Sequence, residues 1–485
     1  MRSEVGASRL STVLVWILGL VALRETAPGF RPKHLVWIAQ GLSAGRGLSF
    51  LAYLGLILFL LPAANRLRKL KITKTVSAGL VALLLIFFLS EFLMGLLSGS
   101  ATLEVMALRI TVIGAGVWGW LAAPHFKWKI PKPSFRDPAL KLLGVLLFFF
   151  LLREQLRQVA DRAIPFVPFG DEIHTWFEMS KGFVNSGLVS TLHTHNYYPG
   201  IPWLIALSSR IFGVHNDEWL FGYPAFLAMA IMGWVWEVSR GTKSWVAGLA
   251  FLTFVFITST DLSFYFTGTL YGEGTTSLLL SVLLAEIYLR WEDRKSPIQQ
   301  SLAGMVLVLG FCGLSKPPMA TLLPLFGLLA AGVISRGRGV SLRTGCAAAV
   351  ILLESLPAWI WKQSLMHFGL KPEYSVKPAE IIAKGFSWDV LGNLFKRVAT
   401  FRSISNVYGA ALAIAFVICF LQRKKDLGNL MVGTCLIYFG FVFGLYCTLW
   451  QATEIGSMER YCSHSAIACL MLIPLAFTQT SRESL

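Results

Sequence analysis

The chain has 485 residues, of which 55% are hydrophobic and only 14% are charged, and its formal net charge at pH 7 is +17. Long apolar runs recur along the whole length, which excludes an ordinary soluble globular protein. The lysines and arginines lie in short clusters between these runs and not on one amphipathic face, so the charge does not indicate nucleic-acid binding. The composition predicts an all-α polytopic membrane protein whose apolar runs form membrane-spanning helices.

Taken in chain order, the apolar runs predict about 14 transmembrane helices. The first follows two arginines and resembles a signal peptide, but no small-x-small cleavage site follows it, so we interpret it as a retained helix. The predicted spans lie near residues 10–23, 47–64, 77–98, 102–123, 139–153, 217–238, 244–258, 272–290, 300–314, 318–335, 343–362, 407–421, 428–449 and 462–478.

The basic clusters predict the orientation, because lysine and arginine in short loops stay on the cytoplasmic side. All the clusters and both termini fall on one side if residues 201–213 do not cross the membrane. That run is short, carries Arg210 and follows two prolines, which favours an interfacial or re-entrant helix. The clusters are Arg66/Arg68/Lys69/Lys71/Lys74, Lys127/Lys129/Lys132/Arg136, Arg240/Lys243, Arg290/Arg294/Lys295, Arg336/Arg338/Arg343 and Arg423/Lys424/Lys425.

The chain divides into two predicted regions. Residues 1–130 form an accessory four-helix transmembrane region that ends in a proline- and lysine-rich linker, "KWKIPKPSFRDP". Residues 131–485 form the core and contain two long outer segments, 154–216 and 363–406. The ionisable residues at the ends of apolar runs converge on the outer side, and such groups are functional candidates because they are costly at membrane depth.

Five motifs follow one another in the core and are all predicted on the outer side. They are "GDEIHTW", "NSGLVSTLHTHNYYPGIPWLIALSSRIFG", "TLYGEGTTSLLLSVLLAEIYL", "GLSKPPMATLLPL" and "MERYCSHSAIACLMLIPL". In this order they resemble the GT-C glycosyltransferases, among them the protein O-mannosyltransferases and the aminoarabinose transferase of lipid A. The four preceding helices depart from the family pattern.

The resemblance implies a GT-C-like helical bundle with interfacial helices on the outer face of a bacterial inner membrane. It implies that a sugar passes from a polyprenyl-phosphate donor to a lipid, glycan or protein acceptor by direct displacement, without a metal or another cofactor. Rival functions are a transporter or flippase, and a membrane subunit that binds prenyl-linked lipids without catalysis. Charges on one face and the lack of an internal repeat favour the enzyme.

Asp171 and Glu172 are the catalytic candidates. The acceptor must lose a proton as it attacks, and a carboxylate beside it can accept that proton. We assign this role to Asp171, with Glu172 as a second catalytic residue. A solvated helix cap ahead of "IHTWFEMSKGF" is the alternative interpretation of the pair.

Lys316 and Arg460 are the candidates for binding the donor phosphate, which leaves as an anion. Arginine offers a planar fork for bidentate contact, and Glu459 is placed to hold it. Lys316 precedes Pro317 and Pro318, which stiffen its turn. Interfacial snorkelling of both long side chains is the alternative.

Glu273, His195, Tyr197 and Tyr198 are the candidates for substrate binding. A carboxylate at the start of an apolar helix needs a cation or a hydroxyl partner, which singles out Glu273. His193 and His195 have a spacing that suits a metal, but no third ligand accompanies them, so no metal site is predicted. The outer loop 363–406 also contains a predicted amphipathic helix, either a gated lid over the site or a static cover.

Overall fold

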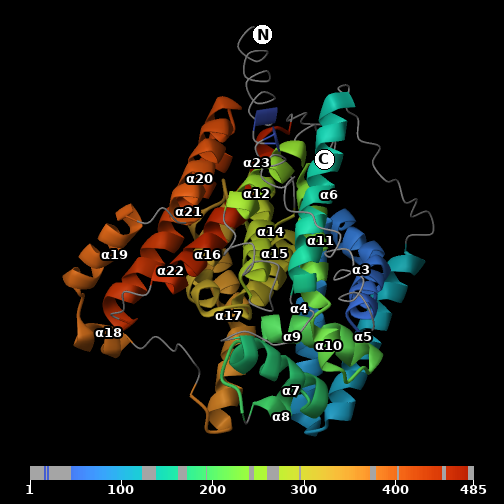
Figure 1. Ribbon diagram of the computed structural model, residues 1–485. Helices are drawn as coiled ribbons and strands as arrows, with labels where there is room; N and C mark the ends of the chain where they lie inside the picture. The colour runs from blue at the N-terminus through green and yellow to red at the C-terminus, as the bar shows by residue number, and fades with distance from the viewer. Residues whose placement is uncertain are drawn as a thin grey trace.

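The computed structural model describes a helical protein (Figure 1). It contains helices and turns but no strand in the part of the chain that it describes, which confirms the prediction of an all-α fold. The described residues are 16–17, 19–20, 45–122, 138–161, 172–192, 194–239, 245–258, 272–293, 297–371, 378–400, 404–450 and 455–478.

Seven helical segments of the described residues are long and apolar enough to cross a membrane. Each coincides with a predicted span, which supports a membrane protein; the count of 14 stays a prediction. The segments are α3 (Gly45–Lys69), α4 (Val76–Ser98), α5 (Ala101–Leu121), α10 with α11 (Asp217–Leu220, Tyr223–Val238), α16 (Pro317–Ile334), α17 (Val340–His367) and α21 with the start of η3 (Lys425–Leu445, Tyr446–Trp450).

Several other helices contain apolar stretches shorter than the roughly 20 residues that a span needs. All but α9 coincide with predicted spans, so their place in the membrane depends on packing as well as length. These helices are α6 (Pro138–Asp161), α9 (Gly200–Phe212), α12 (Trp245–Thr258), α15 (Ile298–Gly313), α20 (Ile404–Leu421) and α22 (Ile455–Leu470), which is followed by α23 (Ile473–Ala476).

Helix α14 (Glu273–Glu292) lies with α15 in the middle of the bundle, between α3–α5 on one side and α20–α22 on the other (Figure 1). It packs against α15, α16 and α22. Although its sequence is apolar over most of its length, it carries Glu273, Glu286 and Arg290, and all three are buried. Twenty residues span about 30 Å, so α14 connects the two ends of the bundle.

Helices α3, α4 and α5 pack into the bundle and not beside it. The hydroxyl of Tyr53 in α3 donates to the carbonyl of Ile205 in α9 at 2.6 Å. The carboxylate of Glu286 in α14 accepts hydrogen bonds from the backbone N–H groups of Lys74 and Thr75, at 2.7 and 2.8 Å. Residues 45–122 therefore share a core with the later helices. The predicted boundary near residue 130 stays a prediction.

Basic clusters that the sequence places on one side meet at one end of the bundle. Lys74 forms an ion pair with Asp293, the guanidinium of Arg336 stacks 3.5 Å from the ring centroid of Trp291, and Trp291 Nε1 donates to Asp426 at 3.0 Å. This end of the bundle is called the basic end below. The clusters at 127–136 and 240–243 lie outside the described residues, and the cytoplasmic orientation of the basic end stays a prediction.

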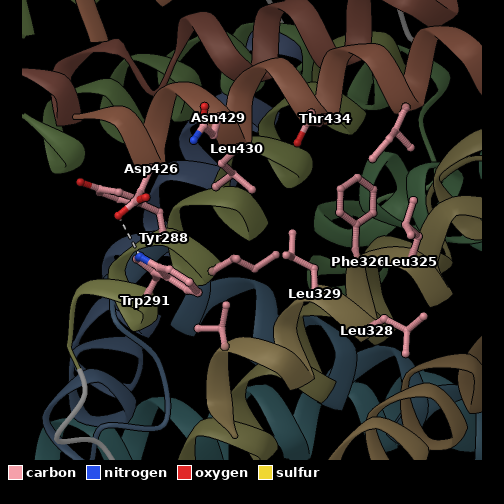
Figure 2. Close-up of a pocket in the computed structure, with 14 residues that line it drawn as sticks. Tyr288, Trp291, Leu325, Phe326, Leu328, Leu329, Asp426, Asn429, Leu430 and Thr434 are labelled. Atoms are coloured by element: carbon pink, nitrogen blue, oxygen red, sulfur yellow. Dashed lines mark hydrogen bonds between the residues drawn. The ribbon is translucent and has the colours of Figure 1, made fainter. Parts of the chain in front are cut away.

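A cavity of about 580 Å³ opens between α14, α16 and α21 next to the basic end (Figure 2). Its walls are largely leucine, isoleucine and aromatic side chains, with Asp426 and Asn429 at one edge.

Short helices gather at the opposite end of the bundle, near the last turns of α17 (Figure 1). They are η2 (Glu172–Phe177), α7 (Glu178–Ser186), α8 (Leu188–Thr191), α9 and α10. Helix α9 is 13 residues long, about 20 Å, and is buried from Gly200 to Arg210. It is too short to cross, and protein surrounds it, which fits the re-entrant alternative better than a helix lying on the membrane surface.

The predicted amphipathic segment forms α18 (Pro378–Lys384) and α19 (Trp388–Thr400), at the side of the bundle beside α21 (Figure 1). Val390 and Leu394 are buried, whereas Trp388 is 74% exposed and Phe395 is 55% exposed. The ring of Phe395 lies 5.5 Å from that of Phe443 in α21. The segment has the apolar outer face of a membrane-surface helix, and both alternatives, gated lid and static cover, stay open.

Candidate functional site

Lys316 lies at the end opposite the basic end, where it precedes the first turn of α16. Two prolines open that helix, and their fixed φ angles and missing N–H groups suit its first turn. The backbone of Lys316 is extended, with φ −144° and ψ 154°. Its side chain is nearly fully buried, and the ammonium nitrogen is 2.8 Å from Oε1 of Glu273. A lysine inside protein is not the snorkelling residue of the alternative interpretation.

Glu273 is the first residue of α14 and is completely buried. The preceding residue, Gly272, allows the two side chains to meet. A Cβ atom at position 272 would lie 2.9 Å from Cε of Lys316 and 2.3 Å from Cδ1 of Ile201. While Oε1 of Glu273 faces Lys316, Oε2 is buried without a hydrogen-bond partner among the described residues. The carboxylate therefore keeps one oxygen for a further donor.

Arg460 comes from a third element, the second turn of α22. Its Nε is 3.9 Å from Oε1 of Glu273, and its side chain is 15% exposed. Two cations from separate helices thus converge on one buried carboxylate. Glu459 lies beside Arg460 in the sequence, but the structure describes only its backbone.

Aromatic rings surround the lysine. The ammonium group of Lys316 lies 5.1 Å from the ring centroid of Trp176 and 5.8 Å from that of Tyr461. Tyr197 packs edge-on against Trp176, with 4.8 Å between ring centroids, and Tyr198 packs against Tyr197 in turn. Both predicted tyrosines are buried. Tyr197 therefore packs against Trp176, and Trp176 is the residue that contacts the ammonium group of Lys316.

The loop that carries these tyrosines is tied to the Lys316 turn through the backbone. The N–H of Gly200 donates to the carbonyl of Leu314 at 2.8 Å. A Cβ atom at position 200 would lie 2.7 Å from the Leu314 carbonyl oxygen, so this contact requires glycine. The indole of Trp361 in α17 also donates to the carbonyl of Tyr197 at 3.1 Å.

His464 was not among the predicted site residues. Its Nδ1 is 2.9 Å from the hydroxyl of Tyr438, and its Nε2 is buried without a hydrogen-bond partner among the described residues. It lies on α22, four residues after Arg460. Residues four apart share a helix face, so the spacing from Arg460 was a usable signal. Trp176, inside the "GDEIHTW" motif, was missed as well.

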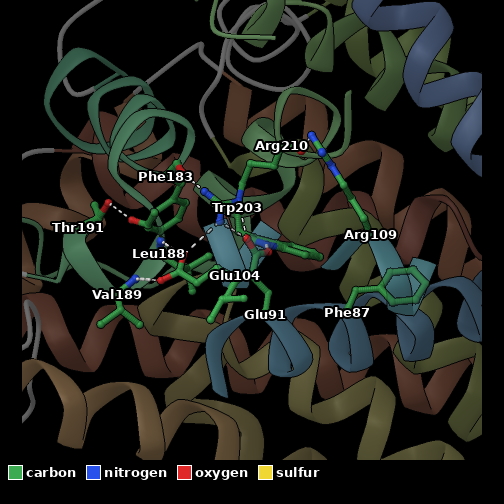
Figure 3. A network of polar contacts seen from close by, with 12 residues as sticks. Phe87, Glu91, Glu104, Arg109, Phe183, Leu188, Val189, Thr191, Trp203 and Arg210 are labelled. Carbon is green, nitrogen blue, oxygen red and sulfur yellow. Dashed lines mark hydrogen bonds and ion pairs between the residues drawn. The ribbon is translucent and has the colours of Figure 1, made fainter. Parts of the chain in front are cut away.

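A second polar network holds α9 in place (Figure 3). Arg210 forms buried ion pairs with Glu91 of α4 and, at 3.1 Å, with Glu104 of α5. Trp203 Nε1 donates to Glu91 at 2.7 Å, and the N–H of Val189 donates to Glu104 at 3.1 Å. Glu91 and Glu104 belong to the predicted accessory region, residues 1–130. They nevertheless bind α9, which follows the loop with Tyr197 and Tyr198 in the predicted core.

Asp171 lies outside the described residues, as does His193, and Glu172 is described by its backbone alone. The helix η2 begins at Glu172, so a helix start does follow Asp171, and both interpretations of the acidic pair stay open. His195 lies in the loop after α8 and is half-buried. Burial lowers the pKa of its imidazole, which favours the neutral form.

Across the described residues, no group of three or more histidine, cysteine, aspartate or glutamate side chains is arranged to hold a metal ion. The described site is instead built from two cations, one carboxylate, one imidazole and several aromatic rings. Buried cations of this kind bind anionic oxygens, and aromatic rings pack on sugar or lipid.

Compared with models of protein families, with curated proteins and with solved structures, the chain gives no match.

Proposed function

We propose that this protein transfers a sugar from a polyprenyl-phosphate donor to a lipid, glycan or protein acceptor at the outer face of a bacterial inner membrane. The observation that carries the proposal is the convergence of Lys316 and Arg460 on Glu273 at a buried end of the bundle. The phosphate of a lipid-linked donor is an anion that would be buried in this apolar protein. Two neighbouring cations can compensate its charge there.

In the proposed reaction the acceptor oxygen attacks the anomeric carbon of the sugar. The new bond to that carbon forms as the bond to the phosphate oxygen breaks, so the anomeric configuration inverts. The polyprenyl phosphate leaves with the bonding electron pair, and Lys316 and Arg460 stabilise its charge. The carboxylate of Asp171 accepts the acceptor's proton. No step requires an oxidant or a reductant.

Glu273 has a different task in this scheme. Its Oε1 orients Lys316, and its unpartnered Oε2 is placed to accept a hydrogen bond from a sugar hydroxyl. His464 Nε2, likewise unpartnered, offers one neutral donor or acceptor near the same cations. Buried polar atoms without partners favour the binding of a ligand that supplies them.

The decisive experiment uses purified protein in lipid nanodiscs, given polyprenyl phosphates that carry radiolabelled mannose or aminoarabinose and an extract of envelope acceptors. An enzyme releases polyprenyl phosphate and moves the label to an acceptor, and the Lys316→Ala variant does so at least about 10-fold more slowly. Donor binding without label transfer would favour the non-enzymatic binder. Label that crosses the bilayer still attached to its prenyl carrier would favour the flippase.

A further inference from the structure

The cavity between α14, α16 and α21 lies away from the candidate transfer site (Figure 2). The transfer site is at the Glu273 end of α14, whereas the cavity is lined by Ile287, Tyr288 and Trp291 near the other end of the same helix. Fourteen residues separate Glu273 from Ile287, which corresponds to about 20 Å along the axis. A ligand bound in this cavity would therefore be separate from one bound at the transfer site.

The walls of the cavity are suited to a hydrocarbon chain. Leu325, Leu328 and Leu329 of α16 face Leu430 and Ile437 of α21. Leu325, Leu328, Leu329 and Ile437 remain between 41% and 48% exposed, so the space is open to the side of the bundle. An apolar space open toward lipid is filled at little cost by a chain that is already in the bilayer.

The depth of the cavity matches one leaflet. From Asp426, the first residue of α21 that lines the cavity, to Ile437 there are 11 residues, or about 17 Å. Half of a bilayer's hydrocarbon core is about 15 Å thick. A chain that enters at the basic end and stops at Ile437 has the length of one phospholipid acyl chain, whereas a polyprenyl chain of many isoprene units would continue beyond the leaflet.

The mouth of the cavity has the chemistry of a headgroup site. Trp291 and Tyr288 are the aromatic residues typical of a membrane interface. Arg336 stacks on the Trp291 ring at 3.5 Å, and the Lys424 ammonium group lies 5.9 Å from the Tyr288 ring centroid. Neither cation forms an ion pair with a described residue. Burial lowers the pKa of Lys424 below its ordinary value, and a phosphate would reverse that effect. Asp426 accepts a hydrogen bond from Trp291.

We propose that this cavity binds one anionic diacyl phospholipid from the leaflet at the basic end. One acyl chain lies between α14, α16 and α21, and the phosphate is held by Arg336 and Lys424. Basic groups beside a cavity between transmembrane helices are a recurring way to hold an anionic lipid. The proposal does not depend on sugar transfer.

Native mass spectrometry of the detergent-purified chain tests this. We expect phosphatidylglycerol to remain bound about 10-fold more tightly than phosphatidylcholine, because the choline ammonium cancels the negative charge of the headgroup and is repelled by Arg336 and Lys424. Leu329→Trp, which fills the cavity, should lose this binding. Leu352→Trp is the matched control, because Leu352 is 71% exposed on α17 and does not line the cavity. Arg336→Ala with Lys424→Ala should remove the preference for the anionic lipid but leave weak binding of both.

A second measurement covers the case in which Leu329→Trp does not fold. Phosphatidylglycerol with a photoreactive acyl chain, applied to the wild-type chain, should crosslink to Leu328, Leu329 or Ile437. Crosslinks confined to other surfaces would overturn the proposal. So would equal affinity for both phospholipids, or displacement of phosphatidylglycerol by polyprenyl phosphate at equal concentration. Loss of sugar transfer in other variants would leave these outcomes unchanged.

Discussion

The ammonium nitrogen of Lys316 and the carboxylate of Glu273 form a buried ion pair at 2.8 Å between the first residue of α14 and the residue that precedes α16. Two helices that are adjacent in the bundle thus begin at the same point. A buried pair of this kind is weak as a source of stability, because desolvation offsets most of the attraction, but breaking it on one side is costly. Variants that remove one partner or both partners therefore distinguish a structural role of Lys316 from a role in binding the donor.

Lys316→Ala should lower the free energy of unfolding by up to about 3–5 kcal/mol, because it removes the nearer cation of a buried carboxylate and leaves Glu273 only the longer contact with Arg460, at 3.9 Å. The double variant Lys316→Ala/Glu273→Gln should recover part of this loss, since no buried carboxylate is then left without its lysine, although Arg460 also loses its contact with Glu273. Donor affinity should stay at least about 10-fold reduced in both. Thermal unfolding and donor binding by microscale thermophoresis measure the two effects.

The matched control for this pair is Lys181→Ala, which breaks the ion pair with Asp217 on a part-exposed surface near the same end. Such pairs contribute about 0–1 kcal/mol, so neither measurement should change much. If the double variant bound donor as well as the wild type, Lys316 would have no role in phosphate binding.

Arg460→Ala should weaken donor binding, and Arg460→Lys should restore it only in part because the planar fork is lost. A loss of about 10-fold for alanine is expected for a charged hydrogen bond. Arg338→Ala, at the basic end, is the control and should bind donor normally. Full recovery by lysine would mean that a point charge suffices there.

Asp171→Asn should leave folding and donor binding intact and reduce transfer by about 10²-fold or more, because asparagine cannot accept the proton. Asparagine caps a helix as well as aspartate does, so the helix-cap interpretation predicts nearly normal turnover. Glu172→Gln should have the smaller effect. Rates under saturating donor decide between the two interpretations.

Arg210→Ala should destabilise the protein by about 3–5 kcal/mol, because it strands the buried carboxylates of Glu91 and Glu104. Arg109→Ala is a suitable control: its guanidinium reaches the Arg210 carbonyl at 3.2 Å without pairing a buried carboxylate. Thermal unfolding in detergent compares them. Similar melting temperatures for Arg210→Ala and the wild type would remove α4 and α5 as supports of α9.

A cysteine at Asp171 or Ser457 should react with an impermeant thiol reagent applied to intact cells from outside, and a cysteine at Lys425 should not. The reason is the positive-inside rule applied to the basic end. Background labelling of the native cysteines is subtracted with the wild-type chain. Labelling at position 425 from outside would reverse the predicted orientation.

The sequence predicts much of the helical pattern, because apolar runs long enough to cross a bilayer almost always form α-helices. The run predicted at 77–98 forms α4 at Val76–Ser98. Even α14 is predicted, at 272–290, although Glu273, Glu286 and Arg290 are buried within the bundle and not exposed to lipid. The run at 201–213 forms α9, a helix of 13 residues, and its path relative to the membrane stays a prediction.

The partners of these charges could not be predicted, because they depend on packing between distant segments. Lys316 and Glu273 are 43 residues apart, and Arg210 meets Glu91 across 119 residues. One signal was present: Glu91 is the only charged residue in its apolar run, so a cation from elsewhere was required. The resemblance to GT-C enzymes singled out Lys316, Arg460 and Glu273 one at a time, and the structure brings these three together.

The backbone contact between Gly200 and Leu314 gives the site a mechanical property. The loop with Tyr197 and Tyr198 ends at Gly200, and Lys316 follows Leu314 by two residues. Because the contact is made by main-chain atoms, replacements elsewhere in the loop change what it presents to a ligand without changing its attachment. A shift of the loop as an acceptor arrives must break this hydrogen bond or carry the Lys316 turn with it. Under the proposed function, acceptor binding at the loop would therefore change the position of Lys316, the proposed phosphate ligand.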